Sequence, residues 1–179
     1  MRYQDIKRHL KPYVMTANRT TTINHAFAAS IAPSDIYNEL TVREGLKILG
    51  QDPDDDLLCA YCGTQAETWD HVHATVKNKE FSGRAHRLGN LLPCCKPCNS
   101  KKGNRDWRVF LQRLDISDDL RRTRERCVDA YLAKYAVVDV IPKELPEYQE
   151  LQEVRHKVLE LFKKADKLAD IIRGKSKAI

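Results

Sequence analysis

Four cysteines in two Cys-x-x-Cys pairs have the spacing most clearly suited to chemistry. The pairs Cys59–Cys62 and Cys95–Cys98 have 32 residues between them. Each pair brings two thiolates within reach of one ion, and two pairs complete the tetrahedral Cys₄ set of a structural zinc site. Cys94 offers a second register, but only Cys95 keeps the two-residue spacing. The sequence therefore predicts structural Zn²⁺ at Cys59, Cys62, Cys95 and Cys98.

Polar residues between and beside these pairs could carry out a hydrolysis. Asp70 is followed directly by His71, Asn90 precedes an apolar stretch, and Asn99 follows the last cysteine of the second pair. A neutral imidazole is suited to accept a proton near pH 7. Carboxylate and amide oxygens are ligands for Mg²⁺ or Mn²⁺. Taken alone, an Asp-His pair is a weak signal, because a capping aspartate and a surface histidine look the same.

In combination, these residues resemble the HNH nuclease family, in its zinc-stapled branch. The family's motif is a β-hairpin followed by a helix. Its first strand ends in Asp-His, here Asp70-His71, and its second carries an asparagine, here Asn90. Its helix carries a histidine or asparagine directly after the last cysteine, here Asn99. The resemblance covers about 45 residues, between Cys59 and Gly103, and the flanking segments match no family of known activity.

The resemblance implies a role for each of these residues. Asp70 and Asn99 would hold a catalytic divalent ion, Mg²⁺ or Mn²⁺, and His71 would be the general base. Asn90 would stabilise the loop that orients the histidine, although Gly89-Asn90 could also be a simple turn. His73 is a second histidine candidate, for substrate contact or as a plain surface residue. The family usually has proline shortly after Asp-His, where this chain has Ala74, so the local turn stays open.

The positive charge is concentrated on the same stretch. The chain of 179 residues has a net charge of +6, and residues 59–113 contain ten Lys and Arg against four Asp and Glu. A local basic excess indicates a polyanionic partner, here double-stranded DNA. The expected DNA contacts are Arg84, Arg87, Lys101, Lys102 and Arg105.

Composition limits the remaining possibilities. No run of 18 apolar residues is present, so the sequence predicts no membrane segment. Residues 1–11 lack the apolar core of a secretory signal. Six cysteines could indicate disulfides, but four of them are in the metal pattern and the other two show no framework spacing. We therefore expect a cytoplasmic protein.

The pattern predicts an α+β fold in which a small zinc-stapled ββα module lies between helical extensions. The expected segments are a helical N-terminal region (1–56), the nuclease module (57–106) and a helical C-terminal region (107–179). Strands are expected near 67–74 and 90–94, with a polar loop at 75–88. Helices are expected at 22–31, 34–49, 97–103, 107–114, 117–135 and 146–173, from capping residues and apolar spacing.

The sequence thus predicts a metal-dependent endonuclease acting on double-stranded DNA, of the restriction or defence type. A phage or mobile-element nuclease of low specificity is the nearest alternative. A zinc module that only binds nucleic acid is the rival from another class, and RNA as substrate also stays open. The long helix predicted at 146–173 has an apolar stripe that could join two subunits in a homodimer, or could pack on the N-terminal helices of its own chain.

Overall fold

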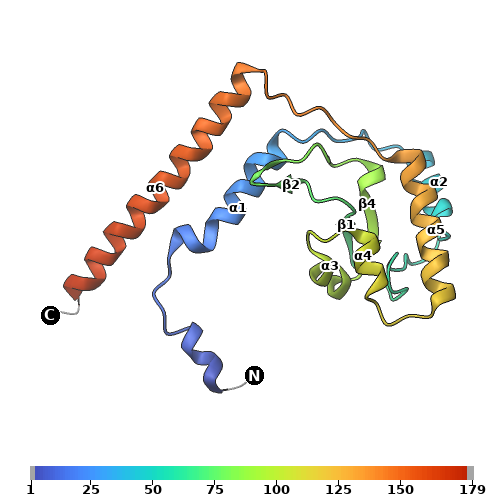
Figure 1. Ribbon diagram of the computed structural model, residues 1–179, viewed down its shortest axis with the longest axis horizontal. Helices are drawn as coiled ribbons and strands as arrows, with labels where there is room; N and C mark the ends of the chain where they lie inside the picture. The colour runs from blue at the N-terminus through green and yellow to red at the C-terminus, as the bar shows by residue number, and fades with distance from the viewer. Residues whose placement is uncertain (1–2, 177–179) are drawn as a thin grey trace. The chain divides into compact units, whose positions relative to one another are not determined.

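The computed structural model describes residues 3–176, drawn as a ribbon in Figure 1. The chain forms two compact units. The first unit combines residues 1–27 with residues 142–179, and the second comprises residues 28–141. The two units are described separately below. The segment boundaries expected from the sequence, at residues 56 and 106, do not coincide with these units and stay a prediction.

The second unit is built on a two-stranded antiparallel hairpin followed by a helix. Strand β1 (Thr68–His71) pairs with β4 (Leu91–Cys94), with Asp70 opposite Leu92 and His71 opposite Leu91. Helix α3 (Lys96–Lys102) begins directly after Cys95 and contacts β1. Pro97 fits the first turn of α3 because its missing N–H would have no partner there. The expected hairpin-plus-helix module is confirmed.

The insert between β1 and β4 has more structure than the expected polar loop. It contains a second short hairpin, β2 (Val76–Lys77) and β3 (Glu80–Phe81), and a 3₁₀ turn, η2 (Leu88–Asn90). Asn78 and Lys79 form the tip of this hairpin, both with positive φ. Two successive residues with positive φ give a tight turn whose twist matches that of the strands. Phe81 is 2% exposed and anchors the hairpin by packing in a small apolar cluster.

Three further helices complete this unit. Helix α4 (Trp107–Gln112) is capped by Asp106 and α5 (Asp118–Tyr135) by Ser117, as expected from the sequence. Helix α2 (Glu39–Ile48) begins later than expected, because the side chain of Asn38 accepts the N–H of Thr41. Ser34, the expected cap, instead forms an isolated parallel bridge with His86.

The core of the unit lies between the hairpin and helices α4 and α5. The buried core residues from these helices are Trp107, Phe110, Leu111, Val128 and Tyr131. The Tyr131 hydroxyl donates to the carbonyl of Leu91 at 3.1 Å, which joins α5 to the start of β4. A Cβ on Gly89 would lie 2.1 Å from the carbonyl oxygen of Tyr135, so this approach requires glycine. Burial of each large side chain contributes roughly 1.5–3 kcal/mol.

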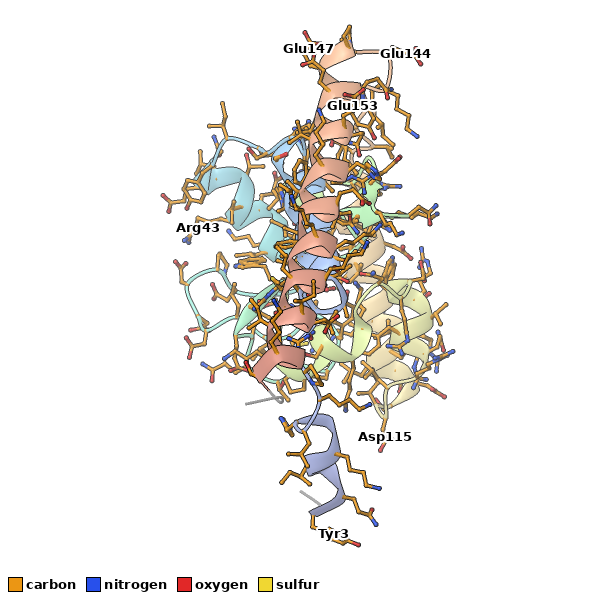
Figure 2. All side chains as sticks on the ribbon, turned by 90° about the vertical axis from the view of Figure 1, so that its left-hand side faces the viewer. Tyr3, Arg43, Asp115, Glu144, Glu147 and Glu153 are labelled. Carbon is orange, nitrogen blue, oxygen red and sulfur yellow. The ribbon has the colours of Figure 1, made fainter. Side chains whose placement is uncertain are left out.

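The first unit consists of η1 (Tyr3–Arg8), most of α1 (Met15–Ser30) and α6 (Pro146–Ser176). The carboxylate of Asp166 in α6 accepts the backbone N–H groups of Met15 and Thr16, at 2.7 and 2.9 Å. Helix α1 therefore begins well before Thr22, where the sequence indicated a start. In Figure 2, Glu147 lies at the end of α6 at which the helix begins, and an acidic group in the first turn complements the helix dipole.

Among the helices within residues 3–176, none combines the length and the apolar character needed to cross a membrane.

Candidate functional site

The two cysteine pairs meet at one point of the second unit. The Sγ atoms of Cys59, Cys62, Cys95 and Cys98 all lie within 4.8 Å of one another. A tetrahedron with Zn–S bonds of about 2.3 Å has edges of about 3.8 Å. The Cys62–Cys95 Sγ distance is 3.7 Å. The four thiols therefore fit a structural zinc ion, and the expected ligand register, with Cys95 in place of Cys94, is confirmed.

Cys94 is a fifth, fully buried thiol beside this cluster. Its Sγ lies 3.8 Å from that of Cys59 and 3.3 Å from the carbonyl oxygen of Cys95. The hydrogen bond between the Cys59 and Cys94 thiols is the main cause that lowers the pKa of Cys59 to about 4, against the opposing effect of burial. Cys59 is thereby favoured as a thiolate, the form that binds zinc.

Asp70 lies in the middle of the module and is 3% exposed. Its Oδ2 accepts the Tyr61 hydroxyl at 2.7 Å and lies 3.0 Å from the ammonium Nζ of Lys102. Burial raises the pKa of the Asp70 carboxyl, while the Tyr61 hydrogen bond and the charge of Lys102 oppose that rise. The Lys102 Nζ also donates to the backbone carbonyl of His71 at 2.7 Å. Helix α3 and strand β1 are therefore joined by a buried ion pair.

His71 is the last residue of β1 and is partly exposed. Its Nε2 lies 3.1 Å from the Nδ1 of His86, and the two rings meet edge to face. Asp70 and His71 thus contact different groups, as expected for neighbours on a strand. Burial lowers the pKa of the His71 imidazole, and the nearby His86 and Lys102 lower it further. At pH 7 the ring is therefore mainly neutral and able to accept a proton.

The Asn90 side chain stabilises the loop that follows His71 through hydrogen bonds. Its Oδ1 accepts the backbone N–H of His73 at 2.8 Å. Its Nδ2 donates to the carbonyls of His73 and Ala85, each at 3.1 Å. These bonds satisfy a side chain that is 4% exposed. Asn90 therefore holds together the two backbone segments that carry His71 and His86, in agreement with the loop-stabilising role expected for it.

The donor set at Asp70 and Asn99 does not fit a preformed site for a divalent ion. Asn99 is partly exposed, and its Nδ2 lies 3.4 Å from the Trp69 carbonyl. Its amide oxygen has the right chemistry for Mg²⁺. Asp70, however, already has Lys102 as its cation and Tyr61 as a hydrogen-bond donor. Within residues 3–176, the four-cysteine cluster is the only metal-sized group of three or more His, Cys, Asp or Glu side chains.

A cavity of about 580 Å³ lies beside the end of β1, between the β2–β3 hairpin and the loop before α4. Its cationic and titratable lining residues are His73, Lys77, Arg84, Arg105 and Asp106. The carboxylate of Asp106 is used to cap α4, where it accepts two backbone N–H groups. Burial lowers the pKa of His73, and the charge of Arg84 adds to this effect. The cavity is therefore basic and suited to an anionic chain.

The other three expected DNA contacts differ in their surroundings. Lys102 is 1% exposed and paired with Asp70, so the expectation that it grips a phosphate is wrong. Arg87 bonds to Asp35 at 2.8 Å and to Asp139 at 3.1 Å, so its guanidinium is already paired with two carboxylates. Lys101 is exposed on α3, and its backbone carbonyl accepts the Arg105 guanidinium.

The sequence does not predict which side chains contact Asp70 and His71. Tyr61 and Lys102 are the partners of Asp70, and His86 is the partner of His71. His86 was visible in the sequence only as one polar residue of a loop. No spacing rule pairs it with His71, because the contact depends on how the insert folds back.

Comparison with known families gives a match in the same stretch. Residues 59–105, about a quarter of the chain, match the family model described as HNH endonuclease. Comparisons with curated proteins and with solved structures found no match. Residues 59–105 are therefore an HNH endonuclease domain, with a Cys₄ cluster consistent with the zinc-binding branch of that family.

Proposed function

We propose that the protein is a metal-dependent endonuclease that hydrolyses phosphodiester bonds in double-stranded DNA. The observation that carries this proposal is the position of His71, at the end of β1 in the HNH domain and directly before Val72 and His73, which line the basic cavity. A neutral imidazole there can activate water next to a bound phosphate. Double-stranded DNA as substrate is supported by the basic excess of the domain.

In this mechanism His71 takes a proton from the attacking water. Asn90 keeps the loop after His71 in place through its bonds to His73 and Ala85. Arg84 and Arg105, with Lys77 and His73, bind the phosphates that flank the cut. In-line attack leaves a 5′ phosphate and a 3′ hydroxyl. Removal of one such base usually slows a reaction by about 10²–10⁴-fold.

Two metal ions with different roles, one structural and one catalytic, are proposed. Zn²⁺ at the four cysteines is structural, and a reducing compartment such as the cytoplasm would keep these thiols free. The nuclease reaction is expected to require Mg²⁺ or Mn²⁺, with the Asn99 amide oxygen as one ligand. Asp70 can join Asn99 only if Lys102 releases its carboxylate.

The biological setting that we propose is restriction or defence, with a phage or mobile-element nuclease as the alternative. A non-catalytic zinc module is the rival function. It is disfavoured because Asp70, His71 and Asn99 occur together in the matched domain. Nothing in a pure binding module requires all three.

We also propose that two copies associate through α6. Val154, Leu161 and Leu168 recur every seven residues along this helix and are 47%, 63% and 52% exposed. A stripe of this kind is a seam for helix pairing. Two subunits would bring two sites to the two strands of a duplex.

Light scattering at micromolar concentration tests this dimer. The wild type is expected to be a dimer, and a Leu161→Asp, Leu168→Asp variant is expected to be a monomer. This variant should also nick plasmid DNA more than it linearises it. A wild-type monomer with and without DNA would contradict the dimer.

The nuclease proposal is tested with supercoiled plasmid, linear duplex DNA and RNA of matched sequence. Purified protein is expected to cut both DNA substrates with Mg²⁺ or Mn²⁺ and to stop in EDTA. Preferential cutting of RNA would redirect the substrate class. Binding without cutting of any substrate, in either metal, would support the non-catalytic rival.

A further inference from the structure

His71, the proposed base, contacts the ring of a second histidine, His86, which has no role in the proposed reaction. His86 lies in the insert after β3, and its Nδ1 is 3.1 Å from Nε2 of His71. The ring centroids are 5.2 Å apart and the planes make an angle of 70°. At this distance the two nitrogens are within hydrogen-bond range, so one must carry the proton and the other the lone pair.

His86 is held from both sides by backbone contacts. Its N–H donates to the carbonyl of Pro33 at 3.0 Å, and its carbonyl accepts the N–H of Asp35 at 3.4 Å. The preceding residue, Ala85, is 1% exposed, and its carbonyl accepts from Asn90. The segment before α2 and the Asn90 side chain therefore hold the backbone at His86 in place. His86 therefore lies in a segment whose backbone is held by hydrogen bonds, and not at the tip of an unsupported loop.

A metal ion shared by the two rings would be the other explanation for two nitrogens at this distance. Such an ion needs at least one more ligand. Within the part of the chain that the structure describes, no third His, Cys, Asp or Glu ligand atom joins these two nitrogens in a metal-sized group. The nearby charged side chain, Lys102, is a cation and donates to the backbone carbonyl of His71. The geometry therefore favours a hydrogen bond.

We propose that His86 is a positioning residue that holds His71 in the tautomer with its proton on Nε2 and its lone pair on Nδ1. Nδ1 of His71 is then the atom that takes the proton from water. This inference rests on the proposed function, since it assumes that His71 is the base. The Nε2–H of His71 donates to Nδ1 of His86, and this bond also fixes the ring plane. Base catalysis needs such a fixed orientation, because a misdirected lone pair cannot reach the water.

Loss of this acceptor should affect the chemical step more than DNA binding. In a serine protease, the wrong tautomer of the catalytic histidine costs about 10⁴ in kcat. The partner of His71 is a neutral ring and not a carboxylate, so a smaller loss, on the order of 10–100-fold, is expected here. KM should change little, because the phosphate-binding residues of the basic cavity are untouched.

The test uses three substitutions at position 86 in the full chain with its zinc. An Asn side chain places an oxygen near the position of the His86 Nδ1, whereas the Gln oxygen lies farther out, near Nε2. His86→Ala and His86→Gln are expected to lower kcat for plasmid cleavage, and His86→Asn is expected to restore most of it. His156→Ala, at an exposed position of α6 outside the HNH domain, is the control for loss of an imidazole. Thermal unfolding shows whether each variant is folded.

A second measurement reads the tautomer directly and needs no activity. In protein with ¹⁵N-labelled histidine, the His71 signals of the wild type are expected to show a protonated Nε2 and an unprotonated Nδ1. In His86→Ala a mixture of tautomers is expected, and in His86→Asn the wild-type pattern. A wild-type His71 with its proton on Nδ1 would overturn the inference whatever the variants do.

The cleavage outcomes separate this inference from the proposed function. If His71→Ala is inactive while His86→Ala cuts at the wild-type rate, the role of His86 is wrong and the nuclease proposal stands. If His71→Ala cuts like the wild type, His71 is not the base and the role of His86 is overturned with it, while the nuclease activity itself stands. An equal loss in His86→Asn and His86→Ala, with both variants folded, also contradicts the tautomer role.

Discussion

At the scale of single residues, the buried pair of Lys102 and Asp70 determines how α3 sits on β1. The Lys102 Nζ has three acceptors, which are the Asp70 carboxylate and the backbone carbonyls of His71 and Gly103. Both side chains are almost fully buried, at 1% and 3% exposure of the residue. A buried pair of this kind adds little net stability, but removal of one partner leaves a charge without compensation.

Lys102→Met tests this pair, because it removes the ammonium while it keeps most of the apolar stem. The free energy of unfolding is expected to fall by about 3–5 kcal/mol. Lys101→Met, at the exposed neighbouring position, is the matched control and should change it by less than about 0.5 kcal/mol. Urea denaturation followed by circular dichroism measures both. Equal unfolding midpoints for the two variants would show that Lys102 is not a structural counter-ion.

The predictable part of the site is the part encoded by local spacing. Cys59 and Cys62, or Asp70 and His71, are close in sequence, so the pattern alone indicates that they act together. The contacts of Asp70 with Lys102 and of His71 with His86 cross 32 and 15 residues. They follow from the packing of α3 and from the fold of the insert, and neither leaves a periodic signal. For the same reason, Lys102 looked like a surface cation in the sequence.

At the scale of elements, α1 owes its first turn to a residue of α6. The Asp166 carboxylate accepts the N–H groups of Met15 and Thr16 and the hydroxyl of Thr16. Free N–H groups at a helix start need such acceptors. The hydrogen bond from the Thr16 hydroxyl, followed by those from the backbone, lowers the pKa of Asp166 below its usual value.

Asp166→Asn should therefore loosen the start of α1 without unfolding the HNH domain. Hydrogen exchange of the amides of residues 15–18 is expected to become faster, while Asp170→Asn, on the exposed side of α6, should leave it unchanged. Because the folded-state pKa lies below the unfolded value of 3.8, the wild-type contact is complete above that pH and is lost as pH falls through the lower, folded pKa. Unaltered exchange in Asp166→Asn at neutral pH would contradict this cap.

Some element ends that are set by neighbouring residues are predictable from the sequence, but the start of α2 is not, because Asn38 caps this helix in place of Ser34. Ends that are set by distant residues leave no signal in the local sequence. The starts of α4 and α5 follow from the capping residues Asp106 and Ser117. The start of α1 was wrong because its cap comes from α6. The sequence predicts a loop where the β2–β3 hairpin lies, because these strands are two residues long and Asn-Lys is not a common hairpin turn.

At the scale of the whole molecule, the HNH domain is small and depends on its four-cysteine cluster. A bound zinc ion contributes about 10–16 kcal/mol of binding free energy, which is also folding free energy. The apolar core contacts the cluster directly, since Cys59, Cys95 and Cys98 belong to it. Loss of the ion should therefore affect the whole of residues 28–141 and not the cluster alone.

Protein purified without added zinc is expected to contain about one tightly bound zinc per chain. Cys98→Ser should be zinc-poor and largely unfolded, whereas Cys94→Ser should keep its metal with a mild loss of stability. Cys127→Ser, outside the cluster, is the control. Metal analysis and near-ultraviolet circular dichroism measure these outcomes. A folded, zinc-free Cys98→Ser variant would show that the domain does not need zinc at the cluster in order to fold.

The central claim, that His71 is the base of a DNA nuclease, is tested most directly by single-turnover cleavage with His71→Ala. Plasmid DNA is used with Mg²⁺ or Mn²⁺, and His156→Ala, on an exposed position of α6, is the matched control. His71→Ala is expected to keep its zinc and its DNA binding in a mobility-shift assay but to cut about 10²–10⁴-fold more slowly than the wild type. His156→Ala should cut normally. Cleavage by His71→Ala at the wild-type rate would contradict the claim.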